Sequence, residues 1–222
     1  MKVQTIFRIL LIVIVLVLSV LAFRSIMRPE KFKMVYTERE TEIRNRLTTL
    51  RAAQQVYKIE NKTYADNIDK LVEFVKNGTI TIVKINGSIP EGMSEADAFA
   101  KGFITKSEEK YPASKRILEI DENVKAINLK NFQFIPENDG KKFSIQTATI
   151  HNTFQVYRID VSLDEVLSNM DRSITPEDAN FLTKGVNIIL YNGLEKEKQY
   201  RNLYKPMWMG SLTEAVTTGS WE

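Results

Sequence analysis

The most regular hydrophobic pattern is a single apolar run near the N-terminus. Residues Ile9–Phe23 read ILLIVIVLVLSVLAF, in which only Ser19 is polar. With the residues up to Met27 the segment is about 20 residues long, which spans a hydrocarbon core of about 30 Å at about 1.5 Å per residue. We therefore expect a transmembrane helix whose lipid-facing residues are Ile9, Leu10, Leu11, Ile14, Leu16, Leu18, Leu21 and Phe23.

A cleaved signal peptide is the rival interpretation of this run. MKVQTIFR serves as a basic leader, and Val20-Leu21-Ala22 resembles a small-residue cleavage site. The run is at the long end for a signal peptide, so we favour an anchor. Its orientation stays open. Basic residues on both flanks place the soluble part in the cytoplasm by simple counting, whereas a short basic N-terminus favours export.

A second helical pattern follows Pro29, where we expect the first helix to kink or break. It runs from about Lys33 to Glu60, and its apolar stripe consists of Tyr36, Ile43, Leu47, Leu50 and Tyr57. Three interpretations remain for this stripe: packing on the protein's own sheet, contact with a partner helix in a coiled coil or filament, and a membrane-surface face. Glu40 and Gln54 interrupt the heptad spacing, which weakens the coiled-coil interpretation.

The rest of the chain changes to a mixed pattern. A short helix is expected from about Ile68, with Asp66 or Asn67 as its cap and Asn77-Gly78 as a left-handed end. A strand follows at Thr79–Ile85, and residues 88–112 form a long excursion expected to be a loop. Further on we expect a three-stranded antiparallel meander with a bulge near Val156, made of Ala126–Ile135, Lys142–Ile150 and Thr153–Val161.

The remaining elements are shorter. They are a helix at Leu163–Met170, a helix beginning at Thr175-Pro176 and a buried strand at Gly185–Tyr191. The predicted fold class is α+β, with a transmembrane helix continuing into a long amphipathic helix packed on an antiparallel sheet. The predicted regions are an anchor (1–28), an amphipathic helical region (29–78) and a β-rich soluble domain (79–222).

Composition narrows the class of protein. There are 31 Lys and Arg against 28 Asp and Glu, and much of the excess flanks the apolar run, so the charge suits lipid headgroups better than nucleic acid. The chain has no cysteine, which excludes disulfides, thiolate metal sites and cysteine nucleophiles. With 43% hydrophobic and 27% charged residues over the whole sequence, the bulk of the chain has an ordinary globular composition.

Candidate catalytic chemistry is sparse. His151 is the only histidine and lies at an expected two-residue turn, where a structural role is favoured. The acidic stretches Asp121-Glu122 and Glu137–Gly140 lack the spacing of a calcium loop. We therefore expect that the protein has no catalytic or metal-binding residues and no cofactor, and that it is not an enzyme. An enzyme that uses carboxylates alone is the alternative. The aromatic C-terminal region seals the core or forms an interface, with Trp208 as the candidate contact.

One part of the chain resembles a known family. The order of a helix, a Tyr, a short Asn-containing turn, a second Tyr and a short amphipathic helix is similar to type IV pilins and type II secretion pseudopilins. The matching residues are Leu47, Leu50, Ala53, Tyr57, Asn61, Tyr64, Asn67, Leu71 and Val72. The resemblance covers roughly residues 5–78 and implies an N-terminal membrane helix, a sheet laid against it and an extracytoplasmic domain. The family's leader motif is absent from residues 1–8.

The sequence thus favours a membrane-anchored, pseudopilin-like structural or assembly component of a bacterial cell envelope. We expect a single-pass inner-membrane protein with a periplasmic domain, which binds lipid and either other envelope proteins or itself. The candidate partner-binding residues are Tyr36, Ile43, Leu47, Leu50, Tyr57 and Trp208. The alternative is a membrane-tethered ligand-binding or sensor domain that uses the 88–112 excursion.

Overall fold

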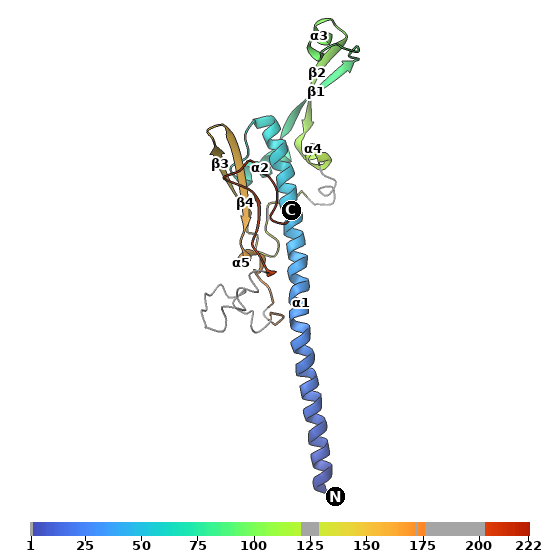
Figure 1. The fold of residues 1–222 in the computed structure, drawn as a ribbon, viewed down its shortest axis with the longest axis vertical. Coiled ribbons are helices and arrows are strands. Elements are labelled where there is room, and N and C mark those ends of the chain that lie inside the picture. The colour runs from blue at the N-terminus through green and yellow to red at the C-terminus, as the bar shows by residue number, and fades with distance from the viewer. Residues whose placement is uncertain (1, 121–128, 172, 176–202) are drawn as a thin grey trace. The chain divides into compact units, whose positions relative to one another are not determined.

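A computed structural model describes residues 2–120, 129–171, 173–175 and 203–222 (Figure 1). The chain divides into two compact units. Unit 1 comprises residues 1–43, 135–140 and 161–207, and unit 2 comprises residues 44–134, 141–160 and 208–222. A long N-terminal helix runs through both units, and the strands form a two-stranded and a three-stranded sheet. The α+β class predicted from the sequence is therefore confirmed.

Helix α1 (Lys2–Asn61) is continuous, so of the kink or break expected at Pro29 the break is wrong. A proline inside a helix removes one hydrogen bond and crowds the carbonyl four residues earlier. Pro29 nevertheless lies inside α1, which Figure 1 shows as one continuous helix. The predicted boundary between the anchor (1–28) and the amphipathic helical region (29–78) therefore lies within one continuous helix.

The two halves of α1 differ in burial. Its first half is exposed, whereas from Phe32 onward one face is buried. The buried positions follow a spacing of three and four residues, as expected for a helix with one packed face. The positions with this spacing are Phe32, Tyr36, Arg39, Ile43, Leu47, Leu50, Ala53 and Val56, and Thr49, Ala52 and Gln54 widen the buried face.

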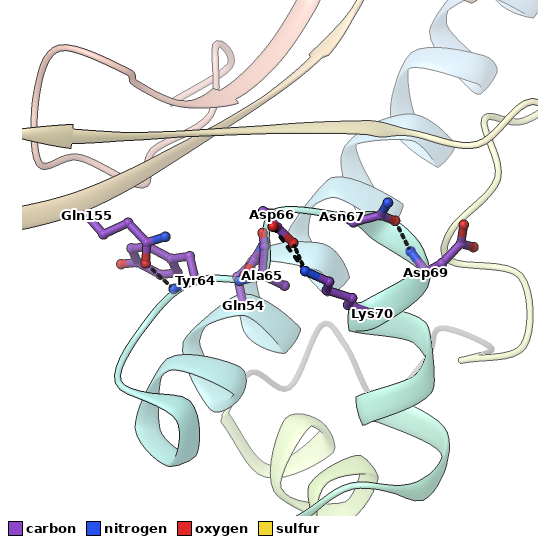
Figure 2. Close-up of polar contacts among 8 residues, drawn as sticks. All are labelled: Gln54, Tyr64, Ala65, Asp66, Asn67, Asp69, Lys70 and Gln155. Carbon is purple, nitrogen blue, oxygen red and sulfur yellow. Dashed lines mark hydrogen bonds and ion pairs between the residues drawn. The ribbon is translucent and has the colours of Figure 1, made fainter.

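A hydrogen-bonded turn joins α1 to helix α2 (Ile68–Asn77). The fully buried Gln54 amide donates to the Ala65 carbonyl over 2.9 Å and accepts from the Ala65 N–H over 2.9 Å. The Tyr64 N–H donates to the side-chain oxygen of Gln155 in strand β4 (Phe154–Val161). Figure 2 shows the residues that make these contacts. It also shows the Asn67 side chain, which accepts from the Asp69 N–H over 2.7 Å and so caps α2. Two glutamine side chains therefore hold the backbone of this turn.

Helix α2 ends differently from the prediction. Gly78 has φ −74° and ψ 153°, so the expected left-handed end is wrong. The Gly78 N–H donates to the Phe74 carbonyl over 2.8 Å, and the chain passes directly into an extended strand. A Cβ at residue 78 would lie 2.4 Å from the Phe74 oxygen. Glycine is thus required here for close approach and not for a positive φ.

The first sheet pairs β1 (Thr79–Gly87) with β2 (Ile104–Pro112) in antiparallel register, from Thr79↔Pro112 to Gly87↔Ile104. The strand predicted from Thr79 is confirmed. The expectation that residues 88–112 form only a loop is wrong, since they contain β2 and helix α3 (Glu95–Ala100), which Ser94 caps. In β2 only Ile104 is buried, so its sequence lacks the alternation that marks a strand. Helix α4 (Ala113–Ile120) follows directly.

The second sheet has the order β3 (Ser144–Ile150), β4 (Phe154–Val161) and β5 (Met207–Gly210). The predicted hairpin is confirmed, but its predicted two-residue turn is wrong, because Ile150 pairs with Phe154 and three residues lie between them. In this turn His151 and Asn152 have φ of 50° and 55°. Residues 129–135 form turns with one isolated bridge at Phe134, so the predicted strand ending at Ile135 is wrong in its described part. The third strand is β5 instead.

The predicted bulge near Val156 is also wrong, because β3 and β4 pair without interruption from Ser144↔Asp160 to Ile150↔Phe154. Val156 and Tyr157 point to opposite faces of the strand and both are buried. In β4 the apolar residues change from even to odd positions between Val156 and Tyr157 because the strand is covered on both faces there.

The last described helix, α5 (Leu163–Val166), is shorter than the predicted Leu163–Met170. A capping box of Ser162 and Glu165 begins it. The helix predicted at Thr175-Pro176 and the strand predicted at Gly185–Tyr191 lie outside the described residues, apart from Thr175 itself.

We predict that Gln54→Leu destabilises unit 2 by about 1–3 kcal/mol, because a side chain of similar volume leaves two buried backbone groups of Ala65 unpaired. The matched control is Gln55→Leu, which changes the same residue type on a half-buried position of the same helix turn. Urea unfolding of the full chain in detergent, followed by fluorescence of Trp208 and Trp221, measures both variants. Equal loss in the two variants would contradict the assigned role of Gln54.

Candidate interaction surfaces

The apolar run of α1 is exposed on every side. The residues predicted to face lipid keep between 48% (Ile14) and 65% (Phe23) of their surface exposed, and none of the run is buried within the described residues. The one polar side chain, Ser19, donates to the Val15 carbonyl over 2.8 Å, so it leaves no unpaired donor. By length and composition the helix is able to cross a bilayer, a criterion that a signal sequence near the N-terminus also meets.

The predicted partner-binding stripe lies mostly in the interior. Ile43, Leu47 and Leu50 are at most 1% exposed, and Tyr36 is buried as well. These four side chains contribute to the core, which was the first of the three interpretations, and they present no surface to a partner. Tyr57 is half-buried, and its ring packs edge-on against Phe74 of α2 with centroids 5.0 Å apart.

Unit 1 is held by an aromatic cluster on α1. The ring of Tyr204 packs edge-on against Phe32 and Tyr36, at centroid distances of 5.1 Å and 4.6 Å. The Tyr36 hydroxyl donates to the Lys205 carbonyl over 3.3 Å. Burial raises the pKa of Tyr36 to about 12, and the nearby Glu40 carboxylate adds to the effect.

Arg39 is the second contact of α1 in unit 1. Its guanidinium donates to the Val166 carbonyl over 3.2 Å and also to the Ser168 carbonyl, so a cation satisfies the free carbonyls at the end of α5. Burial lowers the pKa of Arg39, and the carboxylates of Glu137 and Glu42 oppose that change. The sequence pattern gave Arg39 no role, because a single arginine within a helical charge pattern looks like a solvated side chain.

The C-terminal aromatic residues pack within unit 2. Trp208 is half-buried, and the Arg158 guanidinium lies 5.5 Å from its ring centroid. The Arg44 guanidinium of α1 lies 5.8 Å from the Trp221 ring centroid. The neighbouring residue Glu222 forms an ion pair with Arg51 over 2.6 Å. These contacts give Trp208 and Trp221 partners inside the chain, as expected for residues that close a core.

The described residues offer no assembled catalytic centre. They contain no group of three or more His, Cys, Asp or Glu side chains able to hold a metal ion. His151 is exposed at the tip of the β3–β4 hairpin. Burial also raises the pKa of Tyr157 and of Tyr204, but these phenols lie in different units, and Tyr204 packs against other aromatic rings as a structural side chain does.

The β1–β2 ribbon and α3 carry exposed apolar side chains. Helix α3 lies at the end of the ribbon (Figure 1). We call this part of the chain, residues 79–112, the arm. Five of its large apolar side chains are between 43% and 52% exposed, whereas Ile80 and Ile104 are buried. The exposed ones are Val83, Ile85, Ile89, Phe99 and Phe103. Lys106 ties α3 to the ribbon, since it pairs with Glu95 over 2.7 Å and lies 5.6 Å from the Phe99 ring centroid.

The sequence prediction missed the arm. Its first strand, TITIVKING, has apolar residues at both parities, a pattern that normally indicates burial on both faces. The structure leaves much of this strand exposed instead. Clustered exposed apolar side chains of this kind are typical of an interaction surface.

Comparisons of the chain with protein-family models, curated proteins and solved structures find no match. The features that bear on function are therefore the two exposed apolar surfaces, on the first half of α1 and on the arm.

We predict that Tyr36→Phe changes the alkaline stability of unit 1. The folded-state pKa of Tyr36 lies above its ordinary value of 10.0, so its stabilising effect is complete below pH 10 and is lost as the pH rises towards 12. At pH 8 the wild type should be more stable by about 0.5–1.5 kcal/mol because of the bond to Lys205. This difference should narrow between pH 10 and 12 in denaturant titrations; a constant difference would contradict the assignment.

Proposed function

We propose that the chain is a single-pass membrane protein of a bacterial cell envelope that acts through protein–protein contacts and not as an enzyme. The observation that carries the proposal is the composition of α1. An apolar segment exposed on all sides continues without a break into a segment whose side chains are buried in the protein. A helix that is apolar all round is stable in lipid or inside a protein, and the described residues do not cover this one.

The energetics support an anchor. Leu, Ile, Val and Phe each favour the bilayer centre by about 0.3–0.6 kcal/mol, so Ile9–Phe23 favours insertion by roughly 4–8 kcal/mol in total. The same side chains would remain in contact with water in the absence of a membrane. The uncleaved segment would then be a signal-anchor, and the soluble part would act while tethered.

The order of elements supports an assembly role similar to that of pilins and pseudopilins. Their architecture combines an apolar first half of a long helix, a packed second half, a short turn and an antiparallel sheet. In this chain the corresponding parts are α1, the turn held by Gln54, α2 and the two small sheets. We accordingly place the soluble part in the periplasm, with lipid and other envelope proteins or further copies of the chain as partners.

The arm favours this proposal over a tethered ligand-binding or sensor domain. Small-molecule sites are concave and bury most of the ligand. Residues 88–112 contribute a strand and a short helix to a ribbon whose apolar side chains are exposed. Such a surface suits a contact with another polypeptide better than one with a small ligand.

The anchor is tested by charging the apolar run. We expect the wild type to stay in the membrane pellet after alkaline carbonate extraction, with an intact mass that begins at Met1. Ile14→Arg combined with Leu18→Arg should release the protein, because each arginine costs about 2.5–3.5 kcal/mol at the bilayer centre. The control combines Met34→Arg with Ile59→Arg, two exposed positions of α1 outside the run, and should stay in the pellet. A soluble wild type that starts at Phe23 would refute the anchor.

The side of the membrane is tested separately by protease accessibility. We expect the soluble part to resist added protease in intact cells and to be degraded in spheroplasts, since a periplasmic domain is reached once the outer membrane is opened. Protection in spheroplasts, with degradation only after lysis, would place it in the cytoplasm instead.

A further inference from the structure

The outer edge of β1 is open between Val83 and Gly87. In an antiparallel pair, alternate residues turn their backbone groups towards the partner strand and away from it. The Thr81 N–H donates to the Glu60 carboxylate over 2.9 Å and so points away from β2. Val83 and Ile85 have the same parity as Thr81, so their N–H and C=O groups also point outward. Within the described residues these outward groups have no hydrogen-bond partner.

The two edges of the ribbon are protected differently. β2 carries four charged residues and ends at Pro112, features that discourage strand pairing. Pro112 faces Thr79 at a position whose N–H would point outward, so the ribbon loses no hydrogen bond there. β1 has only one charged residue, Lys84, and no proline. Only the β1 edge is therefore suited to receive another strand.

The exposed side chains extend this edge into a surface. Val83 and Ile85 point to the same face of the ribbon and are 52% and 43% exposed. A strand added beside them would place its own alternate side chains on the same face. The best occupant is thus an extended segment with β-branched residues at alternate positions, and β1 itself has this composition.

We propose that the β1 edge pairs with the β1 edge of a second copy of the chain, antiparallel and about a two-fold axis at Lys84. This register pairs Val83 of each copy with Ile85 of the other and satisfies all four of their outward backbone groups in each chain. Moving the axis to Val83 would require the Thr81 N–H that Glu60 already holds. Moving it to Ile85 would pair Val83 with Gly87, whose φ is 118°.

The charges permit this arrangement. The axis brings the two Lys84 side chains together, and like charges directly opposite each other cost about 0.2–1 kcal/mol. Each Lys84 forms an ion pair with Glu109 on the same face of its own ribbon, so each pair is close to neutral. On the other face the pairing covers only Val83 and Ile85. The inference names one partner for the protein–protein contacts proposed above and rests on that proposal only in treating the arm as a contact surface.

Single cysteines test the register directly, because the chain has no cysteine of its own. At Lys84 the two chains should face each other as a non-hydrogen-bonded pair with Cα atoms about 4.5 Å apart, within disulfide range. Lys84→Cys in membranes should therefore give, under mild oxidation, a disulfide-linked species of twice the chain mass. The matched control is Ser107→Cys, which faces Lys84 across the ribbon and would lie about 14 Å from its own copy.

Proline substitutions separate pairing from folding of the ribbon. In the Lys84→Cys background, Val83→Pro removes an outward N–H without breaking a bond to β2 and should reduce cross-linking at least about tenfold. The control is Glu108→Pro, because Glu108 faces Val83 across the ribbon. This substitution strains the ribbon to the same degree but leaves the β1 edge intact. It should keep cross-linking close to that of Lys84→Cys alone.

The proposal is overturned by any of three results: no dimer with Lys84→Cys, equal cross-linking with Ser107→Cys, or a dominant adduct of another mass, which would mean a different partner. Equal loss with Val83→Pro and Glu108→Pro would overturn it as well. Failure of the anchor is a separate outcome, since release from the membrane pellet changes the fractionation but not the pattern of cross-links.

Discussion

The packing of this protein depends on one unbroken helix that the rest of the chain covers only in part. At about 1.5 Å per residue, α1 is roughly 90 Å long. Its second half contributes a large share of the buried side chains in both units, including Phe32 and Leu47. Within the described residues its first half has no such cover, and its apolar side chains are exposed. The division of α1 into covered and uncovered lengths thus separates the part that contributes to the core from the part that is apolar and exposed.

Buried polar side chains fix how the helix is covered. An apolar face alone would allow α1 to shift by one helical turn against the segments packed on it, because one leucine would take the place of another at little cost in free energy. Gln54 pairs with both backbone groups of Ala65, and Arg39 binds the carbonyls at the end of α5, so neither contact survives a shift. Each unit therefore has at least one polar contact on α1 that sets its register, while the aromatic and aliphatic side chains around it provide the area that is removed from water.

Much of this fold could be predicted from the pattern of residues, and the errors have physical causes. The apolar run, α2 with its Asn67 cap, the start of β1 and the β3–β4 hairpin follow from periodicity and turn chemistry. β2 could not be predicted, because its residues are charged and almost entirely exposed. β5 is short and pairs with a strand distant in sequence, a contact that no local pattern reports. The candidate surface on the arm was missed because the apolar residues of β1 occur at both parities, which normally indicates a buried strand. The stripe including Ile43 and Leu50 was recognised but proved to be interior.

The late position of β5 has a consequence for biosynthesis. The Gln54–Ala65 contact joins residues close in sequence, so this turn is able to form while the chain is still emerging. Strand β4 in contrast pairs with β5 (Met207–Gly210), which is synthesised much later, so one edge of β4 stays unpaired until then. A nascent chain that is already held in a bilayer by its first residues would keep this edge away from most other chains, and it would still be a good substrate for chaperones that recognise extended apolar segments.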